Sequence, residues 1–173
     1  MTGLQKFAKK VGWGHLILST GLFSGFAPVA SGTFGTLVSI PLYVGLMKLG
    51  AFLPAGWMQW MPYAAISLVL FLLGCQGANR IEDASQEKDP GIIVIDEIVG
   101  YLITMAFLPL RWQWIIAGFF VFRFFDVLKP YPIRSLDENP NLKGFGVMID
   151  DALAGVYSNL ALQVAKFLIE RFA

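Results

Sequence analysis

The distribution of charge along the chain constrains its fold more than any other feature. No Asp, Glu, Lys or Arg occurs between Lys10 and Lys48, and none occurs between Lys48 and Arg80. Only 14% of the 173 residues are charged, compared with about a quarter in soluble domains. Such a chain cannot cover a water-exposed surface of its own size, so the sequence predicts an integral membrane protein.

The composition excludes several classes of protein. A formal net charge of +1 is too small for a nucleic-acid-binding domain, and 56% hydrophobic residues are incompatible with intrinsic disorder. The single cysteine, Cys75, cannot form an internal disulfide, so a secreted disulfide-stabilised fold is also excluded. Because one domain takes about 150 residues, we expect residues 1–173 to form a single membrane domain.

Five apolar stretches predict bilayer-crossing helices, each close to the roughly 17–25 residues that a spanning helix needs. They are residues 36–53, 61–78, 92–110, 112–128 and 145–169. Residues 1–33 superficially resemble a signal peptide, but glycines and hydroxyl residues interrupt the apolar run, so we expect a retained interfacial or re-entrant segment. The predicted fold class is an all-α, polytopic integral membrane protein with about five transmembrane helices.

Two tryptophan-bearing turns set the predicted orientation. Tryptophan is enriched at membrane interfaces, and it occurs in the uncharged turn at 51–62 and in the turn at 111–114. With both turns outside, most of the 13 Lys and Arg residues lie on the other side: Lys6, Lys9, Lys10, Arg80, Lys88, Arg123, Lys129, Arg134 and Lys143. The positive-inside rule then places the N-terminus in the cytoplasm and the C-terminus outside.

This topology places nearly all acidic residues on the cytoplasmic side. Three of them are in polar surroundings, where we expect solvated loop charges: Glu87, Asp137 and Glu138. Five others are flanked by apolar residues: Asp96, Glu97, Asp126, Asp150 and Asp151. If the third helix starts at Asp89 and Pro90, Asp96 lies about 10 Å along it. A carboxylate at that depth costs free energy unless it is paired, bound to a ligand or hydrated.

Three of these acids are followed four residues later by a small residue. The pairs are Asp96 with Gly100, Asp150 with Ala154, and Asp151 with Gly155. Four residues make about one helical turn, so each pair shares a face that a neighbouring helix can approach closely. The alternative is that the glycines only pack and that the acids are interfacial caps at helix N-termini.

The five flanked acids form a candidate metal site. Carboxylate oxygens suit Mg²⁺ or another hard divalent cation, and zinc is disfavoured because the chain offers only Cys75 and the distant His15. Without a cation the acids would repel one another and take up protons. A dication bound by two or three of them would offset that repulsion.

Three cations at the end of the fourth apolar stretch form a candidate anion site. Arg123, Asp126 and Lys129 are spaced three residues apart and share one helical face. Two prolines then stop the helix before Arg134. We interpret Arg123, Lys129 and Arg134 as ligands of an anion beside the metal; the alternative is snorkelling cations with a local ion pair.

A turn rich in glycine and hydroxyl groups, residues 25–36, leads into the first apolar stretch. Free backbone amides and the hydroxyls of Thr33 and Thr36 could bind a phosphate oxygen there, or they could serve only as helix caps. A metal, cations and a helix N-terminus meeting at a lipid interface favour phosphoryl chemistry on a lipid head group.

Four ordered motifs resemble the phosphatidylglycerophosphatase A family. They are SGTFGT at 31–36, DPGIIVIDE at 89–97, FRFFDVLKPYPI at 122–133 and GFGVMIDDALAG at 144–155. The resemblance implies a Mg²⁺-dependent phosphatase of the bacterial inner membrane that converts phosphatidylglycerophosphate to phosphatidylglycerol, with its active site facing the cytoplasm. Its partner would be the phospholipid substrate in the bilayer.

The mechanism we expect is hydrolysis of a terminal phosphomonoester by a metal-activated water. Most metal ligands would come from Asp96, Asp126, Asp150 and Asp151. Glu97 would be a ligand or the general base, and the cations would neutralise the phosphate. An aspartyl-phosphate intermediate is a second possibility.

The competing class is a small ion- or proton-coupled transporter, because intramembrane acids also mark ion pathways. Against a transporter, the acids crowd one end of the predicted helices, and no inverted repeat with broken helices is visible. The sequence leaves the number of metal ions and the oligomeric state open.

Overall fold

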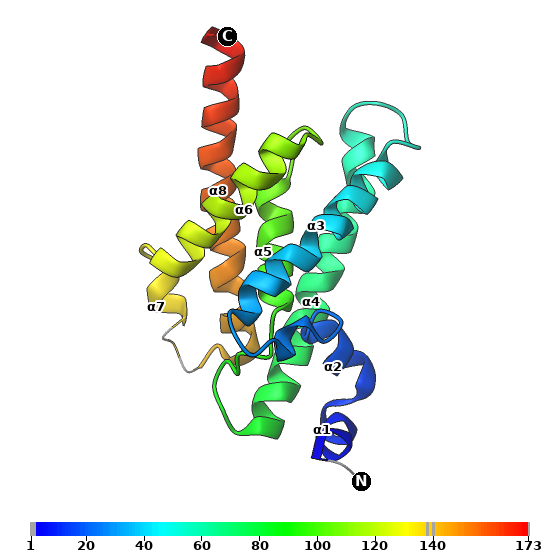
Figure 1. Cartoon of the computed structure of the whole chain (residues 1–173), viewed down its shortest axis with the longest axis vertical. Coiled ribbons are helices and arrows are strands. Elements are labelled where there is room, and N and C mark those ends of the chain that lie inside the picture. The colour runs from blue at the N-terminus through cyan, green and yellow to red at the C-terminus, as the bar shows by residue number, and fades with distance from the viewer. Residues whose placement is uncertain (1–2, 138, 140, 173) are drawn as a thin grey trace.

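The computed structural model describes residues 3–137, 139 and 141–172, and these residues form helices, turns and loops without a strand (Figure 1). The all-α prediction is therefore confirmed. Glu138, one of the three expected solvated loop charges, lies outside the described residues.

The helices follow one another with short connections. In chain order they are α1 (Gly3–Val11), α2 (Trp13–Ser19), η1 (Ser24–Phe26), α3 (Ser31–Gly50), η2 (Trp57–Trp60), α4 (Met61–Ser85), α5 (Ile95–Met105), α6 (Trp112–Leu128), α7 (Ile133–Asp137) and α8 (Lys143–Phe172). The turn after α3 and the turn between α5 and α6 lie toward the end of the molecule that carries the C-terminus, and the N-terminus lies at the opposite end (Figure 1).

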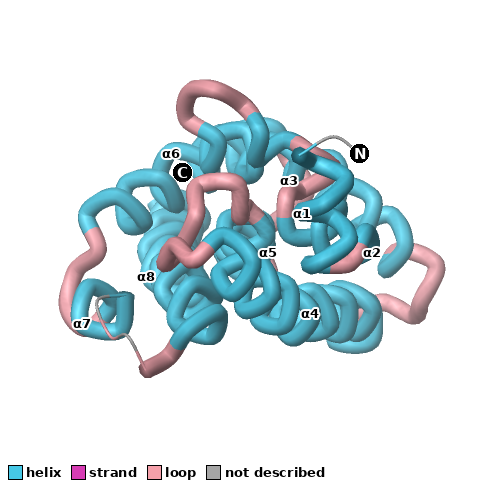
Figure 2. The backbone as a smooth tube through the Cα atoms, turned by 90° about the horizontal axis from the view of Figure 1, so that it is seen from below, coloured by secondary structure: helices cyan, strands magenta, loops and turns pink. Residues whose placement is uncertain are grey.

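Helix α5 forms the centre of the bundle. It packs against α3, α4, α6 and α8, and those helices surround it when the molecule is viewed from below (Figure 2). Every residue of α5 except Glu97 and Ile103 is buried. The helices around α5 instead expose large apolar side chains on their outer faces, including Leu68, Phe120 and Phe167.

Three helical segments are long and apolar enough to cross a membrane: Ser31–Gly50, Trp57–Ser85 and Lys143–Phe172. They contain most of three predicted spans, residues 36–53, 61–78 and 145–169. Their exposed apolar faces are what a lipid-facing surface requires, because a water-facing surface would be rich in charge. Helix α6 has the bounds predicted for it, with 17 residues.

The helix expected over residues 92–110 is shorter than predicted. Helix α5 has 11 residues, which extend only about 16 Å along its axis, roughly half the hydrocarbon thickness of a bilayer. The helix also does not start at Asp89 and Pro90. Asp89 has a positive φ of 46°, and the amide of Val94 donates to Ser19 O at 2.9 Å instead of to a helical carbonyl. This stretch is apolar because other helices cover it, and apolarity alone does not distinguish protein burial from lipid contact.

The N-terminal segment folds back on the bundle. Gly21, Leu22 and Phe23 have φ values of 51°, 55° and 71°, and these left-handed residues reverse the chain between α2 and η1. Gly25 then lies against the backbone carbonyl of Ile92, where no side chain would fit. This packing sets the position of the N-terminus of α3 relative to α5.

Candidate functional site

Five carboxyl groups gather where α5, α6 and α8 meet. Asp96 and Glu97 lie in the first turn of α5, Asp126 lies near the end of α6, and Asp150 and Asp151 lie two turns into α8. One oxygen each of Asp96, Glu97 and Asp151 lies within 4.8 Å of the other two. Asp126 joins this group through Arg123, whose Nη1 atom contacts both Asp126 Oδ2 and Glu97 Oε1. The structure thus brings together all five acids that the sequence singled out.

We call Asp96, Glu97 and Asp151 the carboxylate trio. Asp96 is 7% exposed and Asp151 is 4% exposed. Two buried oxygens of the trio, Asp96 Oδ1 and Glu97 Oε2, have no hydrogen-bond partner. Leaving a buried carboxylate oxygen without a partner is costly, and hard divalent cations prefer clustered carboxylate oxygens. The donor set therefore fits a hard cation.

Small residues allow the three helices to approach. A Cβ added at Gly100 would collide with the Phe122 ring and with the Asp151 carbonyl, and one added at Gly155 would collide with the Gly100 carbonyl. Both features expected from the spacing are therefore present: the glycines pack, and the acids beside them converge. The alternative was also partly right, because Asp96 and Glu97 lie at a helix N-terminus instead of about 10 Å inside it.

The N-terminus of α3 lies against the trio. A Cβ added at Gly32 would collide with Glu97 Oε1 and would lie 3.1 Å from Arg123 Nη1. Only a glycine fits there without moving Glu97. The first turn of a 20-residue helix adds partial positive charge beside a cluster that is otherwise rich in negative charge.

Two ion pairs flank the trio. Arg123 Nη1 lies 2.6 Å from Asp126 Oδ2 and 4.0 Å from Glu97 Oε1. Lys129 Nζ lies 2.6 Å from Asp150 Oδ2. Burial alone would lower the pKa of the Lys129 ammonium, but the neighbouring carboxylates of Asp150 and Asp137 raise it above its ordinary value, so Lys129 is charged.

Asp137 was missed by the sequence analysis. Its Oδ2 atom lies 3.0 Å from Lys129 Nζ, and 30% of its side chain is exposed, so the prediction of a solvated loop charge is wrong. The contact exists because the turn after α6 folds α7 back toward Lys129, and the fully buried side chain of Ile133 anchors α7. Nothing in the spacing of Lys129 and Asp137 predicts that turn.

The remaining predicted anion ligands differ in how exposed they are to solvent. Thr36 is buried, and its hydroxyl donates to Gly32 O at 2.9 Å, so its one proton is committed to its own helix. Thr33 is half-buried in the first turn of α3. Arg134 is exposed on α7, the short helix that ends at Asp137.

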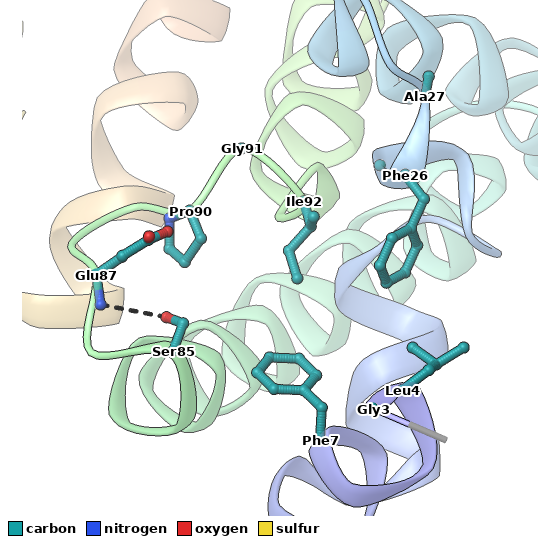
Figure 3. Close-up of a pocket in the computed structure, with 11 residues that line it drawn as sticks. Gly3, Leu4, Phe7, Phe26, Ala27, Ser85, Glu87, Pro90, Gly91 and Ile92 are labelled. Atoms are coloured by element: carbon teal, nitrogen blue, oxygen red, sulfur yellow. Dashed lines mark hydrogen bonds between the residues drawn. The ribbon is translucent and has the colours of Figure 1, made fainter.

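A pocket of about 570 Å³ lies apart from the five acids, between α1, η1 and the loop before α5. Figure 3 shows Phe7, Phe26 and Ile92 pointing into this space, and the dashed line marks the hydrogen bond from the Glu87 amide to Ser85 Oγ. None of the five acids lines it. The carboxylates, and not this pocket, define the candidate site.

The fold and the site define a class of protein: a bundle with bilayer-length apolar helices that holds buried carboxylates flanked by Arg and Lys. Within that class, the chain belongs to the phosphatidylglycerophosphatase A family, whose model matches residues 17–166. The resemblance seen in the sequence motifs is therefore confirmed, and the chain is an enzyme, a phosphatase.

Three related proteins are similar in sequence to most of this chain. A phosphatidylglycerophosphatase A of Haemophilus influenzae is 43% identical over 152 residues, which cover 87% of this chain and 88% of the relative. A protein of that name from Escherichia coli is 38% identical, covering 82% and 77%. A Bacteroides thetaiotaomicron protein, provisionally named a phosphatidylinositol-3-phosphatase, is 40% identical, covering 89% and 94%. No solved structure matches the chain.

Proposed function

We propose that the chain hydrolyses the terminal phosphomonoester of phosphatidylglycerophosphate, giving phosphatidylglycerol and phosphate, and that it requires Mg²⁺. The family and two relatives support this substrate by their names. The observation that carries the metal requirement is the trio, with oxygens within 4.8 Å of one another and two buried oxygens without a hydrogen-bond partner. The transporter alternative is not supported, since the family and these relatives are named as phosphatases.

The trio would hold the metal, and Asp126 and Asp150 would complete its surroundings. When bound, Mg²⁺ would polarise a phosphoryl oxygen and neutralise part of the substrate's charge. Lys129 and Arg123 are positioned beside the same carboxylates, so they would bind the remaining phosphate oxygens. Arg134 and Thr33 are candidates for further phosphate contacts.

Glu97 is our candidate general base. Its Oε2 atom is buried and has no hydrogen-bond partner, so it can accept a proton from an attacking water. The water oxygen forms a bond to phosphorus while the bond from phosphorus to the glycerol oxygen breaks, and that oxygen regains a proton. Attack by an Asp carboxylate to form an aspartyl phosphate is the alternative; trapping of that acyl phosphate with hydroxylamine would reveal it.

Phosphate release from phosphatidylglycerophosphate in detergent micelles tests the function. Purified protein should release phosphate with Mg²⁺ and lose that activity in excess EDTA, and added Mg²⁺ should restore it. Equal activity in EDTA would contradict the metal requirement. Release from phosphatidylinositol 3-phosphate at a higher kcat/KM would contradict the proposed substrate.

We also propose five crossings of the bacterial inner membrane, with the N-terminus and the site facing the cytoplasm and α5 completing its crossing through its flanking loops. Cysteines at Gln59 and Gln113, in a chain with Cys75 replaced by Ala, should react with an impermeant thiol reagent outside spheroplasts. A cysteine at Glu87 should react only after lysis. The opposite labelling pattern would contradict this topology.

A further inference from the structure

Lys129 has two carboxylate partners of different kinds. Asp150, 2.6 Å from the ammonium nitrogen, is on α8 and has a side chain that is 5% exposed. Asp137, 3.0 Å away, is on α7 and has a side chain that is 30% exposed. One partner is therefore part of the five-acid cluster, and the other stands outside it.

Several contacts fix the position of α7 relative to Lys129. Lys129 caps α6 in a left-handed conformation, with φ 42° and ψ 61°, and its amide donates to Phe125 O at 2.9 Å. Tyr157 on α8 donates its hydroxyl to Tyr131 O at 3.2 Å. Lys88 donates to the backbone carbonyl of Asp137. Asp137 is thus held in place by contacts other than its own ion pair.

The second partner changes what Asp150 can do. If Asp150 were the sole partner of Lys129, turning the Asp150 carboxylate toward a metal would leave a partly buried ammonium without a counter-charge, which is costly. With Asp137 present, the ammonium keeps a partner. The ammonium also stays at the edge of the cluster, where a phosphate oxygen can reach it.

We propose that Asp137 is a positioning residue that holds Lys129 beside the carboxylate cluster and so frees Asp150 to face a divalent cation. This inference rests on the proposed function, because it assumes that the cluster binds a cation. Asp137 touches neither metal nor substrate, and it acts through Lys129.

Mn²⁺ binding to the purified full chain, followed by electron paramagnetic resonance, tests the inference without relying on turnover. Asp137→Asn should weaken Mn²⁺ binding about five- to tenfold, the scale of coupling between charged groups in contact, and should raise KM more than it lowers kcat. Asp137→Glu should restore most of the affinity. Asp83→Asn is the matched control, because it removes a charge from the exposed pair with Lys143 without touching Lys129.

The decisive comparison uses Lys129→Met as the background. There Asp137→Asn should leave Mn²⁺ binding unchanged, because the residue through which Asp137 acts is gone. An equal loss in both backgrounds, or a loss no larger than that of Asp83→Asn, would overturn the inference and leave the proposed function intact. A wild-type chain that neither binds Mn²⁺ nor releases phosphate would overturn both.

Discussion

The carboxylate trio and the two ion pairs lie side by side but differ in charge balance. Oxygens of three carboxylates approach within 4.8 Å in the trio, and the one cation contact seen among the described residues is the 4.0 Å distance from Glu97 to Arg123. The ion pairs join Arg123 to Asp126 and Lys129 to Asp150 at 2.6 Å. The protein therefore compensates some of its buried negative charge and leaves the rest uncompensated.

The difference in charge balance indicates that the trio and the ion pairs have different roles. Uncompensated buried carboxylates are unfavourable unless something from outside the chain binds them, which is why we propose the trio as the cation-binding part of the site. The ion pairs are stable without a ligand, and their cations can exchange a carboxylate partner for a phosphate oxygen. Substitutions in the two groups should therefore have different consequences.

The largest expected effect is in the trio. Asp96→Asn should lower the rate of phosphate release at least ~100-fold, because it would remove a charge from the proposed metal-binding trio that no other group replaces. Asp126→Asn should lose less, since Arg123 already balances that carboxylate. Phosphate release at saturating Mg²⁺, with Mn²⁺ binding measured in parallel, checks the order. Equal losses in the two variants would contradict the proposed difference between the trio and the ion pairs.

A smaller effect is expected at the ion pairs. Lys129→Ala should cost about 2 kcal/mol of transition-state stabilisation, or roughly 30-fold in kcat/KM, because it would remove a cation that we propose binds the phosphate. Lys48→Ala is the control, since Lys48 is an exposed cation at the far end of α3. If the two variants had the same kcat/KM, Lys129 would not belong to the phosphate site.

A third prediction compares two glycines of α3. Gly32→Ala should lower kcat about tenfold, because the new methyl group must move Glu97 and small displacements of catalytic groups are costly. Gly45 has no atom within 4 Å of an added Cβ, so Gly45→Ala should keep full activity and gain helix stability. Circular dichroism spectra of the two variants should match that of the unsubstituted protein, which checks that both fold. Full activity of Gly32→Ala would show that Glu97 need not occupy its present position.

The sequence predicted the carboxylate cluster more accurately than it predicted the lengths of the helices. Asp96, Asp126 and Asp150 were identifiable because a carboxylate flanked by apolar residues needs a partner wherever the helices lie. The length of α5 was not predictable in the same way, since residues 92–94 are as apolar as the helix that follows. The start of the helix depends instead on a contact distant in sequence, the hydrogen bond from the Val94 amide to Ser19 O.

The contact between Asp137 and Lys129 was also not predictable from the sequence. The sequence shows an acid in a polar stretch after two prolines, and most such acids are solvated. Its contact with Lys129 depends on the path of the chain between α6 and α7, which a reading of spacing along one helix does not capture. Thr36 shows the opposite error. Its position in a glycine-rich turn suggested a phosphate ligand, but its hydroxyl donates a hydrogen bond within its own helix.

The smallest expected effect is at Thr36. Because its hydroxyl donates to Gly32 O inside α3, Thr36→Val removes one local hydrogen bond, keeps the branched shape and leaves both groups of the site in place. Such a bond contributes about 1 kcal/mol to stability, so kcat/KM should change less than about threefold while the melting temperature falls slightly.

Thr33→Val is the variant to compare with it, since Thr33 is half-buried in the first turn of the same helix. A loss for Thr36→Val as large as that for Lys129→Ala would mean that the hydroxyl leaves Gly32 to bind substrate. The helix N-terminus would then have to be counted with the cations as part of the phosphate site.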